Sequence, residues 1–232
     1  MSYGLQYDIA ARAPASERAA FIRRTYGHLA GAILAFALIE TVLIKFVNVE
    51  PIVSVMFASR LGWLLVLGAF MAVGWLAQIW AQSEASPGLQ YLGLSLYVVA
   101  EAVIFLPLLY IASQVYPDAI PVAGILTLAV FGGLTLAVFV TRADFSYLGP
   151  ILCIGGFIAL GLIVASALIG FSLGLIFMFA MVALLCGYVL FYTSNVMLHY
   201  RTTQHVAASL ALFACIATLF WYILMIVMSN RR

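Results

Sequence analysis

The segment YLGLSLYVVAEAVIFLPLLYIAS, residues 91–113, is the most informative stretch of the chain. It is long enough to cross a bilayer as one helix, which takes about 20 apolar residues. Its apolar residues do not alternate with a period of two, so a membrane strand is excluded. Its one charged residue is Glu101, near the predicted middle of the span. A charge at that depth costs roughly 2.5–3.5 kcal/mol on insertion scales, so Glu101 is a candidate functional residue.

The rest of the chain has the composition of a membrane protein. Of its 232 residues, 66% are hydrophobic and only 8% are charged, whereas soluble domains carry about 25% charged residues. The predicted spans are 25–47, 61–82, 89–112, 119–141, 147–168, 172–198 and 205–228. Backbone polar groups must be satisfied inside each span. We therefore expect an all-α integral membrane protein, a bundle of seven transmembrane helices.

The predicted organisation is an N-terminal tail (1–24), a seven-helix membrane domain (25–228) and a short C-terminal tail (229–232). An odd number of spans places the two ends on opposite sides. The side of the N-terminus would hold Arg12, Arg18, Arg23, Arg24, Arg142 and Arg201, and the other side Lys45, Arg60, Arg231 and Arg232. Because basic residues favour the cytoplasmic side, we expect the N-terminus in the cytoplasm.

Small and aromatic residues suggest how the helices pack. Small residues four positions apart let membrane helices approach closely. Such pairs predict contacts at Gly27 and Gly31, at Gly68 and Ala72, and at Gly155 and Ala159. The aromatic residues of the last span, by contrast, are expected to face mainly lipid; they are Phe213, Phe220, Trp221 and Tyr222.

Signatures of enzymatic chemistry are missing. An intramembrane aspartyl protease needs two aspartates within its spans, and a retinal protein needs a lysine in its last span; the sequence has neither. Its three cysteines lie in apolar segments without zinc-ligand spacing, which favours packing roles. A net charge of +2 gives no indication of a nucleic-acid partner. We expect no enzyme, no cofactor and no metal, with the lipid bilayer as the surrounding partner.

Two buried carboxyl groups are the first candidates for function. Glu101 is either a protonated, hydrogen-bonded interior carboxyl or a site for a proton or another cation. Glu40 lies in the first span and is expected to face the bundle. Lys45 is five residues further, about 140° around the helix, so it is expected to extend to the interface instead of pairing with Glu40.

Further candidates lie in predicted connections on the side of the N-terminus. Arg142 and Asp144 follow the fourth span, and the order Asp144, Ser146 is typical of a helix N-cap region. The alternative is a latch that closes this mouth of the bundle. His199 and His205 precede the last span, and they are either solvated loop histidines or sensors of pH near neutrality.

Several segments resemble the Bax inhibitor-1 family of seven-helix membrane proteins. They are RRTYGHLAGAILAF (23–36), EAVIFLPLL (101–109), GGLTLAVFVTRADFSYLG (132–149), LFYTSNVMLHY (190–200) and SLALFACIATLFWYIL (209–224). The resemblance covers nearly the whole chain, in order. It implies a Bax inhibitor-1-like fold and a non-enzymatic role.

The chain departs from the family at one feature. Many members have an aspartate in each of the last two helices, a pair implicated in pH-gated calcium leak. The matching positions are Thr193 and Cys215. Since calcium sites usually need carboxylates, the departure weakens a calcium-leak function. It resembles a bacterial branch associated with modulating an FtsH-type membrane protease.

This resemblance implies a multi-pass protein of the bacterial plasma (inner) membrane. The leading functional expectation is a regulator that acts by contact, chiefly through residues 1–24, on a membrane protease or a stress response. The alternative is a pH-sensitive leak for calcium or protons, lined by Glu101 and Glu40.

Overall fold

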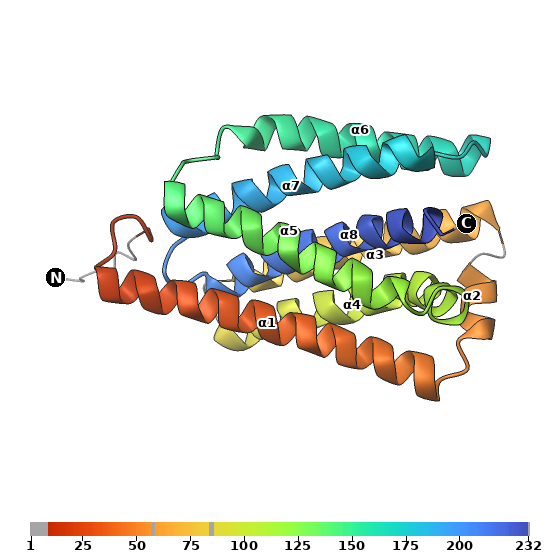
Figure 1. The fold of residues 1–232 in the computed structure, drawn as a ribbon. Coiled ribbons are helices and arrows are strands. Elements are labelled where there is room, and N and C mark those ends of the chain that lie inside the picture. The colour runs from red at the N-terminus through yellow and green to blue at the C-terminus, as the bar shows by residue number, and fades with distance from the viewer. Residues whose placement is uncertain (1–8, 57–58, 84–85, 232) are drawn as a thin grey trace.

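The computed structural model describes residues 9–56, 59–83 and 86–231. These form the helices α1 (Ala15–Phe46), α2 (Glu50–Met56), α3 (Arg60–Ala81), α4 (Pro87–Val115), α5 (Ala119–Thr141), α6 (Leu148–Ile169), α7 (Gly174–Leu198) and α8 (His205–Ser229). In this part of the chain, seven helices are long and apolar enough to span a membrane. The predicted all-α, seven-span bundle is confirmed (Figure 1).

The helix bounds differ from the predicted spans mainly at the start. Helix α1 begins at Ala15 instead of residue 25, because hydropathy marks only the membrane part, whereas the Ala-, Glu- and Arg-containing turns before it also favour helix. The short helix α2 occupies part of the connection between the first two spans and was not predicted.

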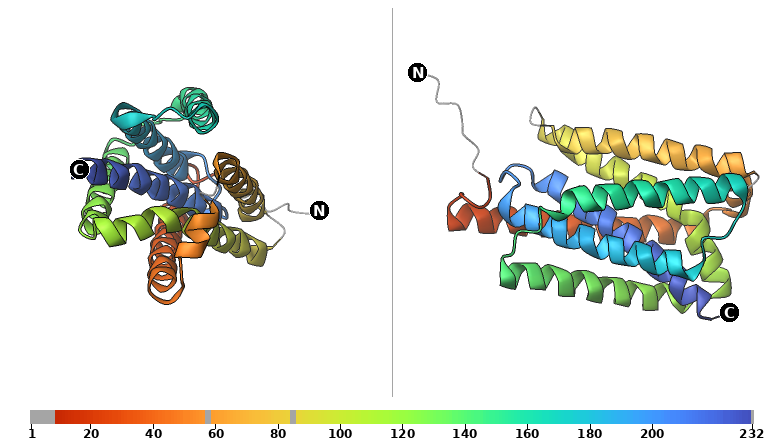
Figure 2. Two further views of the ribbon diagram at one scale, coloured as in Figure 1. Left: turned by 90° about the vertical axis from the view of Figure 1, so that its right-hand side faces the viewer. Right: turned by 90° about the horizontal axis from the view of Figure 1, so that it is seen from above.

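Helices α4 and α8 form the centre of the bundle. In the most apolar 18-residue stretch of each helix, 61% of the residues are buried in α4 and 56% in α8, but only 11% in α6. Helix α8 contacts α1, α3, α4, α5 and α7, and Figure 2 shows it crossing between them. Its side chains Leu212, Leu219 and Leu224 are completely buried. Packing around α8 therefore fixes the core, and α6 lies at the periphery.

The lipid-facing prediction for the aromatic residues of α8 was wrong. Phe213 and Tyr222 are buried, at 1% and 8% exposure, and Phe220 and Trp221 are partly buried against the core. A helix that is apolar all round has no polar face to show which side points inward. The central position of α8, which sequence does not reveal, puts these rings inside.

The small-residue prediction holds for one pair of the three. A Cβ on Gly155 would meet Leu184 of α7 at 2.8 Å, and Ala159 is buried. For the other two pairs it was wrong: a Cβ on Gly27, Gly31 or Gly68 would have nothing within 4 Å. These glycines lie on open helix surface, so their spacing alone does not bring two helices together.

Helices α3 and α4 instead meet at Gly93. A Cβ there would lie 2.5 Å from the carbonyl oxygen of Ala77 and 2.7 Å from the backbone nitrogen of Ala81. Only hydrogen at this position lets the two backbones approach so closely. Gly93 therefore sets the packing of α3 against the central helix α4.

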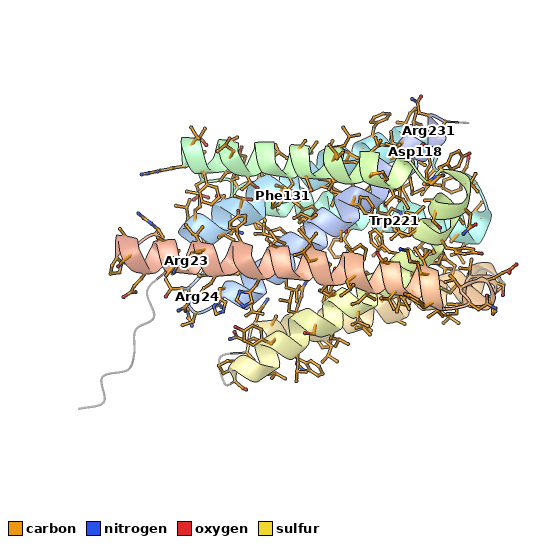
Figure 3. The ribbon with its side chains drawn as sticks, turned by 60° about the horizontal axis from the view of Figure 1, so that its bottom comes forward. Arg23, Arg24, Asp118, Phe131, Trp221 and Arg231 are labelled. Carbon is orange, nitrogen blue, oxygen red and sulfur yellow. The ribbon has the colours of Figure 1, made fainter. Side chains whose placement is uncertain are left out.

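The start of α1 and the end of α8 lie at opposite ends of the bundle (Figure 1). We call these the N-terminal face and the C-terminal face. At the C-terminal face, Arg231 pairs with Asp118 at 3.8 Å (Figure 3). At the N-terminal face, the backbone N–H of Ala10 donates to the carbonyl of Tyr200 at 2.8 Å. The segment before α1 is therefore joined to the α7–α8 connection.

Candidate functional site

Glu101 lies within the central helix α4 and is only 2% exposed. Tyr97 stands one turn earlier on the same face of α4, and its hydroxyl is directed toward the Glu101 carboxyl. The burial that the sequence predicted for Glu101 is thus present, and a polar side chain of the same helix faces the carboxyl.

A group of aromatic rings closes the bundle around Tyr97 and Glu101. We call it the aromatic cluster; it consists of Phe36, Tyr97, Phe105, Phe213, Phe220 and Trp221. Phe213 links α8 to both neighbours, with ring centroids 6.1 Å from Phe36 and 6.2 Å from Tyr97. Phe105 contacts Trp221 edge to face at 4.9 Å. These contacts fill the space between α1, α4 and α8.

A cavity of about 660 Å³ begins at Glu101 and extends to the α6–α7 connection at the C-terminal face. Residues of α3, α4, α6, α7 and α8 line it, and most are apolar. The hydroxyls of Tyr188 and Thr218 also border it, but they donate to the backbone carbonyls of Leu152 and Ala214 at 2.8 Å. Glu101 is therefore the ionisable carboxyl of an otherwise apolar chamber.

Glu40 is also buried, at 4% exposure, which confirms that it faces the bundle. Neither of its carboxyl oxygens has a hydrogen-bond partner among the described residues. Glu40 and Glu101 consequently share no hydrogen bond and form no carboxyl pair. Within the part of the chain that the structure describes, no three His, Cys, Asp or Glu side chains gather as metal ligands.

The two positions that we expected to match the family's aspartate pair are both interior. Thr193 is completely buried and Cys215 is 5% exposed. The hydroxyl of Tyr26 is directed toward those of Thr193 and Thr135, yet none of the three reaches hydrogen-bond geometry with any described residue. A neutral hydroxyl and a thiol thus occupy these two sites, and they carry no charge into the core.

A second polar group lies at the N-terminal face, where Asp144 and His199 meet. The Nε2 atom of His199 is 3.2 Å from Oδ2 of Asp144. The backbone N–H of Ser146 donates to Oδ1 of Asp144 at 2.9 Å, and that of Phe145 donates to Ser194 Oγ at 2.9 Å. Asp144 therefore caps the turn before α6 and ties the α5–α6 connection to the end of α7.

The other candidates at this face stand apart from that pair. Arg142 ends α5 in a left-handed conformation, with φ 53°, and its side chain is exposed. His205 begins α8, and its ring centroid lies 5.1 Å from that of His28, which in turn lies 5.4 Å from Tyr91. The structure thus brings Asp144 to His199 and places His205 in a separate group. Sequence reasoning did not include Tyr97 among the candidates, although it lies one turn from Glu101.

Asp144 gives a pH-dependent prediction. The hydrogen bonds from Ser146, and then the adjacent His199, hold the pKa of the Asp144 carboxyl below its usual range. The ionised Asp144 carboxylate therefore stabilises the folded protein above the usual aspartate pKa of about 4. This stabilisation is lost as the pH falls through the lowered pKa that Asp144 has in the folded protein. Asp144→Asn is expected to lower the melting temperature slightly at pH 7 and by less at pH 3. Thermal denaturation in detergent would measure this, with Glu50→Gln as the control; a difference that is equal at both pH values would contradict it.

The fold and these sites define a multi-pass membrane protein with seven apolar helices, of which the central helix α4 carries the buried carboxyl of Glu101. Residues 18–232 match the model of the family described as inhibitor of apoptosis-promoting Bax1, and the chain belongs to this Bax inhibitor family. The family resemblance found in the sequence is thereby confirmed. No match was found among curated proteins or among solved structures.

Proposed function

We propose that the chain is a non-enzymatic regulator that resides in the bacterial plasma membrane with its N-terminus in the cytoplasm. It acts by contact with another membrane protein. An FtsH-type ATP-dependent protease is the partner suggested by the bacterial branch that lacks the aspartate pair. The observation that carries the proposal is the aromatic cluster, which fills the space between α1, α4 and α8.

The composition of the interior further supports regulation by contact over transport. A leak needs a chain of polar groups through the core, because each uncompensated charge there is costly. Thr193 and Cys215 supply no charge, and Glu40 has no hydrogen-bond partner among the described residues. The hydroxyls of Tyr188 and Thr218, which border the cavity, are already bonded to backbone. These features support regulation by contact over a leak.

The contact surface that we propose is the N-terminal face. Because Ala10 is hydrogen-bonded to Tyr200, the segment before α1 and the α7–α8 connection form one continuous surface. Arg12 and Glu17 are exposed on it. The partner surface would therefore include the bundle as well as the tail of residues 1–24.

Charge changes on this surface test the proposal. Arg12→Glu combined with Glu17→Lys reverses two exposed charges and leaves the net charge unchanged. Losing one important interface residue typically costs at least 1 kcal/mol, so we expect about a fivefold or larger drop in co-purified protease. Deleting residues 1–20 should have the same effect.

The matched control is Lys45→Glu with Glu50→Lys, which reverses two exposed charges at the opposite end of the bundle. Co-purification should be unchanged in this variant. Equal recovery of the protease with both double variants, or full recovery after the deletion, would refute the N-terminal face as the contact surface.

A cation leak is the second candidate function, and one observation favours it. Glu101 borders a cavity of about 660 Å³ that reaches the α6–α7 connection at the C-terminal face. A leak through it would require the aromatic cluster to open, so that Glu101 could exchange a proton or cation with the N-terminal face.

A further inference from the structure

A groove of about 600 Å³ runs between α1 and α4, outside the sites described above. Its α1 side is made mostly of small residues, among them Gly27, Gly31 and Ala35, and Ile39 lies at its far end. Its α4 side is formed by Leu94, Val98 and their neighbours. The groove is thus an apolar channel on a helix pair that faces the membrane.

The two glycines keep the groove open. A Cβ on Gly27 or on Gly31 would have nothing within 4 Å. Larger residues at these positions would project into the groove. The small residues that the sequence suggested for a helix contact therefore leave a channel that an external molecule can enter.

The end of the groove at the N-terminal face is positively charged. Arg23 and Arg24 line it there, together with His28, and Figure 3 shows both arginines near the start of α1. Both side chains are exposed. Among the described residues no carboxylate forms an ion pair with either arginine, and no acidic residue is in the groove lining. Two cationic side chains are thus available to an anion at the mouth of an apolar channel.

The length of the groove matches one leaflet. From Arg24 to Ile39 a helix rises about 22 Å, at 1.5 Å per residue. Half of a bilayer, with its headgroup region, is about 20–22 Å thick. An anionic group at Arg23 and Arg24 and a hydrocarbon chain reaching Ile39 would therefore both be at their natural depth.

We propose that this groove binds one anionic glycerophospholipid from the surrounding membrane. Its phosphate is held by Arg23 and Arg24, and one acyl chain lies along Gly27 and Gly31 against α4. Arginine suits the phosphate because its planar fork binds two oxygens at once. The proposal does not depend on the partner or the function proposed above.

The test measures lipid binding to the purified full-length protein by native mass spectrometry. The delipidated protein is titrated with phosphatidylglycerol and, separately, with phosphatidylcholine of the same chains. One phosphatidylglycerol per chain should bind preferentially. Arg23→Gln with Arg24→Gln should weaken it about thirtyfold, the equivalent of roughly 1 kcal/mol per arginine. Gly31→Leu should abolish it by filling the groove without changing charge, and Ala35→Leu serves as a second filling variant.

Two controls separate the groove from the general surface. Arg18→Gln with Arg142→Gln removes the same charge from the same face but outside the groove lining, and Gly68→Leu adds the same bulk on open surface of α3. Both should bind phosphatidylglycerol as the unmodified protein does.

Several outcomes would overturn the proposal. Equal binding of the two lipids would show no headgroup recognition, and equal losses in the two arginine pairs would show general charge attraction. Competition by glycerol phosphate together with indifference to Gly31→Leu would show an anion site without a chain site. A dimer that Gly31→Leu dissociates would make the groove a contact between two copies instead.

Discussion

Gly93→Leu is expected to abolish the native packing of α3 on α4, and Gly93→Ala is expected to weaken it severely. The first atom of any side chain at this position would lie 2.5 Å from the Ala77 carbonyl oxygen and 2.7 Å from the Ala81 nitrogen. Both obstacles are backbone atoms inside a helix, so they cannot turn aside as a flexible side chain could. Overpacking of a well-packed core typically costs about 1–3 kcal/mol, and occasionally more. The clash outweighs the roughly 1 kcal/mol by which alanine favours helix over glycine.

Thermal denaturation in a mild detergent would measure the loss. The control is Gly161→Ala on α6, where a Cβ has nothing within 4 Å. This control should melt at the same temperature as the unmodified protein or slightly higher. If Gly93→Ala and Gly161→Ala melted together, the close approach of α3 and α4 would not be an essential contact.

The contrast between Gly93 and Gly27 shows what sequence predicts in this protein and what it does not. The spans could be predicted because the bilayer requires about 20 apolar residues in each, and the structure reproduces them closely. The face of each span that points inward could not be predicted, because residues on all sides of these helices are apolar. Spacing favoured Gly27 and Gly31 as contacts, whereas Gly93, which spacing did not single out, makes a closer approach, and its partner is backbone.

The candidate site shows the same division. The burial of Glu101 and Glu40 could be predicted from the cost of a charge in the membrane. The position of Tyr97, four residues before Glu101, also places it one helical turn away in the sequence pattern. The pairing of Asp144 with His199 joins residues 55 positions apart, so only the packing of α6 beside α7 reveals it. The aromatic cluster likewise depends on α8 crossing the centre of the bundle.

Glu101→Lys is expected to prevent correct folding, whereas Glu101→Gln should leave the fold intact. Glutamine keeps an oxygen that can face the Tyr97 hydroxyl, and it fills nearly the same volume. Lysine places a cation at a position that is 2% exposed. Its insertion costs roughly 2.5–3.5 kcal/mol at the centre of a membrane helix, and among the described residues the cavity lining holds no other carboxylate. Yield and melting temperature in detergent should collapse for the lysine variant alone.

The same glutamine variant separates the two proposed functions. Glutamine cannot bind or release a proton, so a leak that uses Glu101 would lose its pH dependence in liposomes. A regulator that acts through the N-terminal face would instead keep its co-purifying protease in Glu101→Gln, because this carboxyl lies in the interior. We expect no cation flux from the unmodified protein or from the variant at any pH, with or without calcium. Flux that depends on pH in the unmodified protein and disappears in Glu101→Gln would refute contact regulation as the sole function and make the cavity at Glu101 part of an ion pathway.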